Sequence, residues 1–246
     1  MMHVMLRLQP IYSVTKRIIH GYEVLSGPLP AQDCETFFSS LSAASHQTLL
    51  VQQLNIIKQR NDYSRYYLNL PVALLSDMFA IEQLLPELHN NIIIELQDPE
   101  NISRLSPSAA RVLNHNLNLI RANDIPIWLD DIAPALFDDV SSLLFKSDGI
   151  KIDKHAFWTL SETPEHLRQF IYDCHTLTQN VTVEGIENIQ QQRVATRCGA
   201  NFLQGFLWPE IHIQHPYLFT YCYPQSSQIE IGNTSNLLNL MNKIVF

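Results

Sequence analysis

Short apolar runs that end in a polar or charged residue recur along the chain. The run 125–131 reads Ile-Pro-Ile-Trp-Leu-Asp-Asp, so apolar residues and a proline lead directly into two adjacent carboxylates. A run this short and apolar is typical of a strand that is buried on both faces in a parallel sheet. Acids at its carboxyl end would lie at the mouth of the sheet, where α/β folds bind ligands. One Asp-Asp pair alone would favour a solvated loop, but the recurrence of the pattern favours a site.

Strand-like and helix-like segments alternate along most of the sequence. The pattern predicts strands near 4–8, 17–25, 66–70, 92–96, 125–131, 149–153, 180–184 and 200–204, and helices near 32–60, 72–88, 106–122, 163–177 and 188–197. Ser106 and Pro107 form a typical helix start, with serine as N-cap and proline at the first helical position. This alternation favours a parallel sheet with helical crossovers. The predicted fold is a TIM-like (β/α)8 barrel, and a doubly wound open sheet is the alternative.

The last part of the chain differs in character from the rest. Residues 1–223 are assigned to the barrel domain, and 224–246 to a C-terminal tail that begins with the flexible connection 225–228. Apolar residues then recur at helical spacing, which predicts a terminal amphipathic helix. Such helices usually pack on their own domain, and binding to a partner is the less common role.

Composition and charge narrow the classes of function. The net charge of -8 argues against direct DNA binding, because that role needs clustered Lys and Arg. The four cysteines are scattered without a Cys-x-x-Cys pair, which is typical of reduced thiols in a cytoplasmic protein. The start of the chain alternates like a strand rather than a signal peptide, and no run is long enough to span a membrane. We therefore expect a cytoplasmic protein with no membrane association.

Polar side chains end nearly every predicted strand, so they should converge on one rim of the barrel. They are Glu23, Asn69, Glu95, Asp130 with Asp131, Lys151, Glu184 and Gln204. Several carboxylates in one mouth repel each other unless cations lie among them. Oxygen ligands of this kind suit Mg²⁺ or Mn²⁺. Two such ions that share an aspartate would polarise a phosphodiester and activate water, with a lysine helping to organise the water.

These segments together resemble a known family. Residues 9–11 (Gln-Pro-Ile), 21–25 (Gly-Tyr-Glu-Val-Leu), 68–70 (Leu-Asn-Leu), 95–98, 129–131 (Leu-Asp-Asp), 150–153, 183–187 (Val-Glu-Gly-Ile-Glu) and 203–205 (Leu-Gln-Gly) resemble the EAL domain of cyclic di-GMP phosphodiesterases over about residues 4–215. The resemblance implies the same barrel with one antiparallel strand. It also implies a set of metal ligands, namely Glu23, Asn69, Glu95, Asp130, Asp131 and Glu184. It further implies catalytic roles for Lys151, Glu23 and Asp131, and ligand- or water-contacting amides at Gln9 and Gln204.

The sequence departs from the family pattern at a residue that binds the substrate and in one loop. Gly27 stands where the family has an arginine that holds a substrate phosphate, a contact worth about 1.5–3 kcal/mol. Residues 132–135 (Ile-Ala-Pro-Ala) replace a glycine-rich loop after Asp131, so freedom at positive φ is lost and Pro134 adds rigidity.

Two functions follow from this balance of retained and altered residues. The first is a degenerate EAL-like protein that acts by protein–protein interaction. Residues 204–209 (Gln-Gly-Phe-Leu-Trp-Pro) resemble the enteric anti-FlhDC factors, which implies binding to FlhD of the flagellar regulator FlhDC and repression of motility. Such a protein would bind cyclic di-GMP weakly or not at all, as a monomer or weak homodimer. The alternative is an active Mg²⁺- or Mn²⁺-dependent phosphodiesterase that converts cyclic di-GMP to linear pGpG, and a sensor that binds without hydrolysis ranks last.

Overall fold

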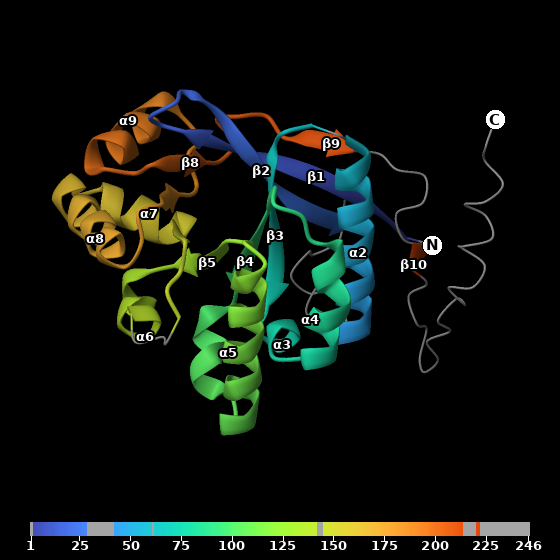
Figure 1. Cartoon of the computed structure of the whole chain (residues 1–246). Helices are drawn as coiled ribbons and strands as arrows, with labels where there is room; N and C mark the ends of the chain where they lie inside the picture. Colours follow the sequence, from blue (N-terminus) through green and yellow to red (C-terminus); the bar gives the residue numbers. More distant parts are fainter. Residues whose placement is uncertain (1, 29–41, 61, 142–144, 214–219, 222–246) are drawn as a thin grey trace.

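A closed β-barrel with helices outside it forms the body of the molecule (Figure 1). The computed structural model describes residues 2–28, 42–60, 62–141, 145–213 and 220–221. Within that part of the chain, the barrel strands are β1 (Met2–Ser13), β2 (Ile18–Pro28), β3 (Arg65–Pro71), β4 (Ile92–Gln97), β5 (Ile127–Ile132), β6 (Gly149–Ile152), β7 (Val181–Val183) and β8 (Phe202–Gln204). The barrel closes because β1 pairs with both β2 and β8.

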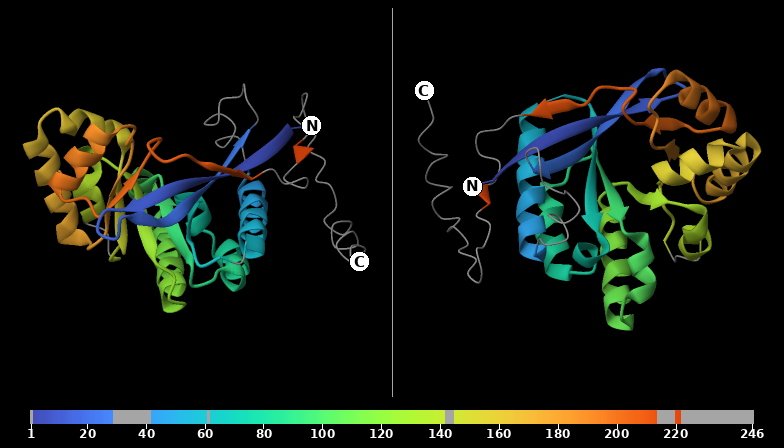
Figure 2. Two further views of the ribbon diagram at one scale, coloured as in Figure 1. Left: turned by 90° about the horizontal axis from the view of Figure 1, so that it is seen from above. Right: turned by 180° about the vertical axis from the view of Figure 1, so that it is seen from behind.

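Strand directions agree with the predicted barrel. From β2 to β8 each strand is parallel to the next, whereas β1 is antiparallel to both of its barrel neighbours. Two short strands, β9 (Ile211–Ile213) and β10 (Thr220–Tyr221), add to β1 in antiparallel pairing. The long ribbon of β1 and β2 extends beyond the other strands, with β9 beside its outer part (Figure 2). The predicted β/α barrel with an antiparallel strand is therefore confirmed, and the open sheet is not.

Helices cover the outside of the barrel. They are α2 (Ala43–Arg60), α3 (Val72–Leu75), α4 (Met78–Leu84), α5 (Pro107–Ala122), α6 (Phe137–Ser141), α7 (Lys154–Ser161), α8 (Pro164–Leu177) and α9 (Ile189–Cys198), with 3-10 turns η1 (Leu85–Glu87), η2 (Pro99–Arg104) and η3 (Pro134–Leu136). The predicted cap is present, because the Ser106 side chain accepts from the Ala109 N–H. The single helix predicted over 72–88 is instead divided, since Asp77 caps a new helix start at α4 by accepting from the Ala80 N–H.

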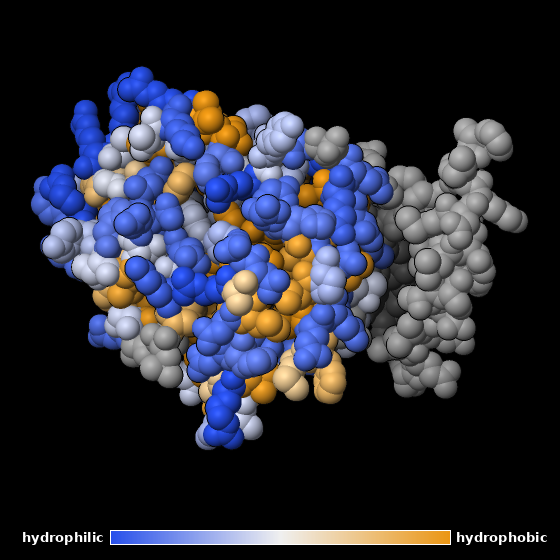
Figure 3. Space-filling model, in the orientation of Figure 1, coloured by the Kyte–Doolittle hydropathy of each residue, from blue (hydrophilic) through white to orange (hydrophobic). Residues whose placement is uncertain are grey.

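The surface carries both polar and apolar side chains. The cysteines that the structure describes are free thiols, in agreement with the prediction from sequence. Cys174 and Cys198 are buried and free. Figure 3 shows apolar side chains in the lower centre of one face, and Met78 and Phe79 of α4 are exposed. None of the helices in the described residues has the length and apolar character needed to cross a bilayer. The predicted tail helix, residues 224–246, lies outside the described residues.

The barrel interior has two layers of side chains. The lower layer is an apolar cluster of Ile11, Tyr67, Ile93 and Trp128, with Phe202 packed against it. Gly149 makes room for the indole, because a Cβ at that position would lie 2.1 Å from Trp128 Cδ2. Side chains two residues apart on a strand share a face. Each strand therefore places a second inward side chain in an upper layer, at the mouth of the barrel.

Candidate functional site

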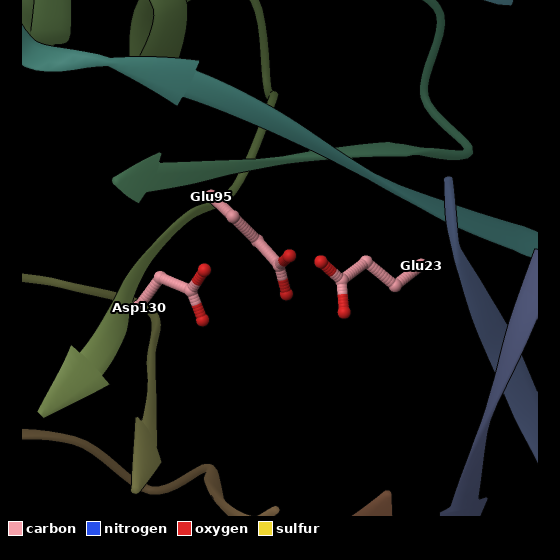
Figure 4. A group of neighbouring side chains, drawn as sticks. All are labelled: Glu23, Glu95 and Asp130. Atoms are coloured by element: carbon pink, nitrogen blue, oxygen red, sulfur yellow. The ribbon is translucent and has the colours of Figure 1, made fainter. Parts of the chain in front are cut away.

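A ring of carboxylates around one lysine fills the upper layer. Within the described residues, Lys151 Nζ lies 2.7 Å from Glu184 Oε1, 2.9 Å from Asp130 Oδ1, 3.2 Å from Glu23 Oε2 and 3.3 Å from Glu95 Oε1. Lys151 and Glu95 are almost completely buried. The carboxylates of Glu23, Glu95 and Asp130 point toward one another from different strands (Figure 4). The strand-end residues that the sequence singled out are thus brought together, as the barrel prediction requires.

Amide side chains hold Glu23 in place on one side of the ring. Asn69 Nδ2 donates to Glu23 Oε1 over 2.6 Å. Gln204 Nε2 donates to Glu23 Oε2 and also to Gln9 Oε1, the latter over 2.7 Å. Burial alone would raise the pKa of Glu23, but the Lys151 charge and these donated hydrogen bonds hold it below its usual value. Glu23 is therefore the fixed, ionised member of the ring.

The other acids of the ring titrate at higher pH than usual. Burial and then the neighbouring negative charges raise the pKa of Glu184 to about 8 and that of Asp131 to about 7, despite the opposing effect of Lys151. The same causes raise the pKa of Asp130, and raise that of Glu95 well above its usual value. Lys151 stays protonated, because the four carboxylates around it outweigh burial and raise its pKa further. The ring therefore contains more acidic groups than one lysine can neutralise, so their ionisation is unfavourable unless further cations are present.

An irregularity in β5 lets two consecutive acids serve the same site. In a regular strand, Asp130 and Asp131 would point to opposite faces. The pairing of β5 with β6 shifts between Leu129 and Ile132, and Asp131 has a left-handed backbone with φ 53°. Asp130 is buried in the ring, whereas Asp131 lies at the rim, partly enclosed by the other acids but with part of its surface exposed to solvent. One oxygen of each still lies within 4.8 Å of the other and of an oxygen of Glu184.

These residues fit a site for two divalent cations. Oxygens of Glu23, Glu95 and Asp130 form one group within 4.8 Å of one another, and those of Asp130, Asp131 and Glu184 form another. Five carboxylates and one ammonium leave a formal charge that two divalent cations would neutralise. Asn69 Oδ1 is buried without a hydrogen-bond partner, so a ligand oxygen is left over beside Glu23. Carboxylate and amide oxygens are the ligands that Mg²⁺ and Mn²⁺ prefer.

A cavity of about 280 Å³ opens directly above the ring. Its lining includes ring members and several residues that the sequence analysis did not assign to the site, namely Leu25, Lys154, Trp158 and Phe206. The Trp158 indole N–H donates to the Gly185 carbonyl over 2.9 Å, and this partly buried side chain packs against the apolar core as well as lining the cavity. A second cavity of about 350 Å³ lies at the start of β4, lined by Leu54, Lys58, Asp62 and His89, at the opposite end of the barrel strands from the ring.

Comparison with known proteins assigns the family. A family model described as the EAL domain matches residues 2–210. The chain belongs to the EAL domain family. The structure of this EAL domain is similar to that of the Xanthomonas citri FimX EAL domain in complex with c-diGMP, with TM-score 0.70, 12% identity, and coverage of 88% of this chain and 91% of that one.

Other solved structures show the same fold. PaMucR phosphodiesterase in a c-di-GMP complex has TM-score 0.67 and 20% identity, with coverage of 83% and 95%. Klebsiella pneumoniae BlrP1 in a manganese and cy-diGMP complex has TM-score 0.69 and 18% identity; 85% of this chain is covered, but the match spans only 56% of the BlrP1 chain. No curated protein sequence matches the chain. At these identities, the similarity shows the fold of this EAL domain and not its activity.

The residues that depart from the family pattern lie next to the mouth in this EAL domain. Gly27 lies beside the Arg7 side chain, since a Cβ at position 27 would lie 3.5 Å from Arg7 Nε. After Asp131, Ile132 is buried and Pro134 begins the turn η3. Trp208 stacks on Tyr12 with ring centroids 4.9 Å apart, so it has a packing role.

Proposed function

We propose that the acidic mouth binds two Mg²⁺ or Mn²⁺ ions and hydrolyses cyclic di-GMP to linear pGpG. The observation that carries this proposal is that Asp130 belongs to both carboxylate groups, so one side chain joins two potential cation positions. Enzymes that displace a phosphodiester bond commonly use two metal ions that share a ligand in this way. The proposal reverses the preference taken from sequence alone, because the ring is assembled with an excess of negative charge.

Each ring residue then has a distinct role. Glu23, Asn69, Glu95 and Asp130 would hold one ion, and Asp130, Asp131 and Glu184 the other. Bound cations would polarise the phosphodiester and lower the pKa of water. Lys151 carries a proton that its neighbours hold firmly, so it acts as a hydrogen-bond donor that orients the attacking water. Gln9 and Gln204, linked by a hydrogen bond, present amide groups to the cavity and are assigned to ligand or water contacts.

Relatives of the same fold support the choice of ligand and metal. The FimX EAL domain and PaMucR phosphodiesterase were both solved with c-di-GMP, and BlrP1 with manganese and cy-diGMP. The cavity above the ring is lined by both apolar and polar side chains, including Trp158 and Phe206. Aromatic faces next to an anion site suit a ligand that has both phosphates and purine bases.

Hydrolysis of cyclic di-GMP in Mg²⁺ or Mn²⁺ tests the proposal directly. Purified protein should produce pGpG, which is detected by chromatography. The kcat of Asp130→Asn should fall by at least about 10²-fold, since one substitution removes a shared ligand. Asp138→Asn is the matched control, because Asp138 is exposed on α6 away from the ring. No turnover by the wild-type protein, or equal turnover by Asp130→Asn, would overturn the proposal.

We propose as a second candidate that the protein binds FlhD of the FlhDC regulator and represses flagellar gene expression in the cytoplasm. This function is supported by departures at two places: Gly27 leaves no side chain for phosphate binding, and Pro134 begins a tight turn next to Asp131. The test is co-purification of the full chain with FlhD, together with swimming motility on overexpression. Recovery of FlhD by Asp130→Asn as well as by wild type would separate this function from hydrolysis. Absence of FlhD from both samples, with unchanged motility, removes the candidate.

A further inference from the structure

We propose that Arg7 binds a phosphate of the ligand at the outer edge of the mouth, in the space that Gly27 leaves open. The inference rests on the proposed function, because it takes cyclic di-GMP as the ligand. It assigns to β1 a cation that no motif in the sequence indicates. The geometry of the β1–β2 ribbon carries the argument.

The strand register places Arg7 on the face that carries the site. In the antiparallel pairing of β1 with β2, Gln9 lies opposite Glu23 and Arg7 lies opposite Leu25. Residues opposite each other, and residues two apart on one strand, share a face of the sheet. Gln9, Glu23 and Leu25 all line the cavity above the ring. Arg7 therefore projects on the cavity side, two residues or about 7 Å along β1 from Gln9.

The guanidinium of Arg7 is held at one corner by Glu210, and the residue beside its opposite edge, Gly27, has no side chain. Its Nη1 lies 3.2 Å and 3.4 Å from the two carboxylate oxygens of Glu210, whose side chain is only 9% exposed. Its Nε and Nη2 would lie 3.5 Å and 3.8 Å from a Cβ at Gly27. With hydrogen there instead of a side chain, no side chain at position 27 covers the Nε and Nη2 edge. The Arg7 side chain is 31% exposed, so an anion can reach it from solvent.

Fixed arginines of this kind are well suited to phosphate. The planar guanidinium offers parallel N–H groups that match two phosphate oxygens, whereas an ammonium is a point charge. Glu210 orients the Arg7 guanidinium by binding Nη1, which leaves the Nε and Nη2 edge for a ligand. Inside the ring, Lys151 already contacts four carboxylates, so it is poorly placed to bind a second phosphate. A ligand with two phosphodiester groups needs a cation outside the ring for the one that the metals do not contact.

Lys154 is the natural comparison for Arg7. It is exposed at the start of α7 and also lines the cavity, so it contributes positive charge to the same mouth. If general attraction of anions were sufficient, loss of either cation would weaken binding to the same degree. A specific contact by the Arg7 fork predicts different effects. Lys154→Ala therefore measures general attraction, and Arg111→Ala, at an exposed arginine of α5 outside the cavity lining, is the matched control.

Steady-state kinetics with cyclic di-GMP and Mn²⁺, together with direct binding of a fluorescent cyclic di-GMP, test the assignment. We expect Arg7→Ala to raise KM and Kd by about 10- to 100-fold with little change in kcat, since a charge-assisted contact is lost but the ring is intact. Lys154→Ala should raise them by less than Arg7→Ala does, as expected for an exposed charge. The swap Arg7→Ala with Gly27→Arg should recover most of the loss, because it supplies a guanidinium to the same space from β2. If Arg7→Ala misfolds, Arg7→Gln keeps a donor for Glu210 and removes the charge, and the same KM change is expected.

The outcomes separate this inference from the proposed function. If wild-type protein neither binds nor cleaves cyclic di-GMP, the proposed function fails, and the role of Arg7 fails with it. If wild type is active, Asp130→Asn is inactive and Arg7→Ala matches wild type, the role of Arg7 alone is overturned. Equal effects of Arg7→Ala and Lys154→Ala without recovery by the swap would also overturn it, since they would indicate unspecific attraction.

Discussion

The two layers inside the barrel come from the same strands, yet they have opposite energetic effects. Tyr67, Ile93 and Trp128 of the lower layer lie two residues before Asn69, Glu95 and Asp130 of the upper one. The lower layer is apolar and closely packed, so its burial stabilises the fold. The upper layer buries several carboxylates around one lysine, which opposes folding unless cations are bound. A shift of two residues along a strand thus separates the part that holds the barrel together from the part suited to chemistry.

Tyr67 marks the boundary between the layers. Its ring packs edge-on against Trp128, with centroids 5.1 Å apart. Its hydroxyl is buried without a hydrogen-bond partner, and burial followed by the negative charge of Glu95 raises its pKa far above the usual value. The phenol therefore stays neutral below the charged ring. The comparison of layers predicts that stability of the lower layer is independent of metal, whereas stability of the upper layer depends on it.

The largest expected effect is in the lower layer. Trp128→Ala should destabilise the protein by about 3–5 kcal/mol, because it leaves a large cavity between Tyr67 and Phe202. The loss should be the same with and without Mn²⁺, measured by urea denaturation followed by circular dichroism. A loss below about 1 kcal/mol would show that this layer is not the core that supports the barrel.

The next effect is in the upper layer, where it should depend on metal. Lys151→Met should destabilise the metal-free protein by about 3 kcal/mol, because four buried carboxylates lose their shared cation. Saturating Mn²⁺ should recover a large part of this loss and stabilise the variant more than it stabilises wild type. Thermal unfolding with and without Mn²⁺ measures both quantities. If Mn²⁺ stabilised the two proteins equally, the prediction that stability of the upper layer depends on metal would be wrong.

The sequence was sufficient to predict the upper layer for a physical reason. Parallel strands buried on both faces are recognised by short apolar runs, and their carboxyl ends meet at one rim. The pattern of apolar runs alone therefore places Glu23, Glu95, Asp130 and Lys151 together. Their roles as ligands and catalysts remain proposals, because convergence alone does not specify a bound metal.

The features that sequence reasoning missed depend on pairing between strands or on local caps. The place of Asp131 follows from an irregular pairing with β6, and that of Arg7 from the antiparallel register with β2. Nothing in the alternation around Arg7 distinguishes it from an ordinary exposed strand residue. Helix α7 was missed because it is short, although Asp153 caps it by accepting from the Ala156 N–H and could have indicated its start.

A smaller effect of opposite sign should follow from Glu95→Gln. The pKa of Glu95 is raised well above its usual value by burial and by the other acids, so an ionisable carboxyl group at this position destabilises the fold at pH 8, where the unfolded chain ionises it. The amide does not ionise in either state, and the metal-free protein should gain on the order of 1 kcal/mol in unfolding free energy. The same change should abolish both hydrolysis and the stabilisation by Mn²⁺. Glu82→Gln on the exposed face of α4 is the control, and a metal-free Glu95→Gln protein that is less stable than wild type would contradict the assignment.

The smallest expected effect is a change of stability with pH at the edge of the lower layer. It tests whether this apolar layer disfavours a charged side chain. His20 packs on Phe202 at the edge of that layer, with ring centroids 4.7 Å apart. Burial, followed by Arg65 and Lys16, lowers its pKa from 6.5 to about 4. The unfolded chain therefore binds a proton at a pH where the folded protein does not, so the stability that this residue provides is complete above pH 6.5 and is lost as the pH falls toward 4. His20→Phe keeps the ring contact without the titration, and its stability relative to wild type should increase by at most about 1 kcal/mol between pH 6.5 and pH 4, because the site is partly exposed. Denaturation curves of the two proteins across this range measure the difference, and a constant difference would mean that His20 takes up its proton equally well in the folded protein.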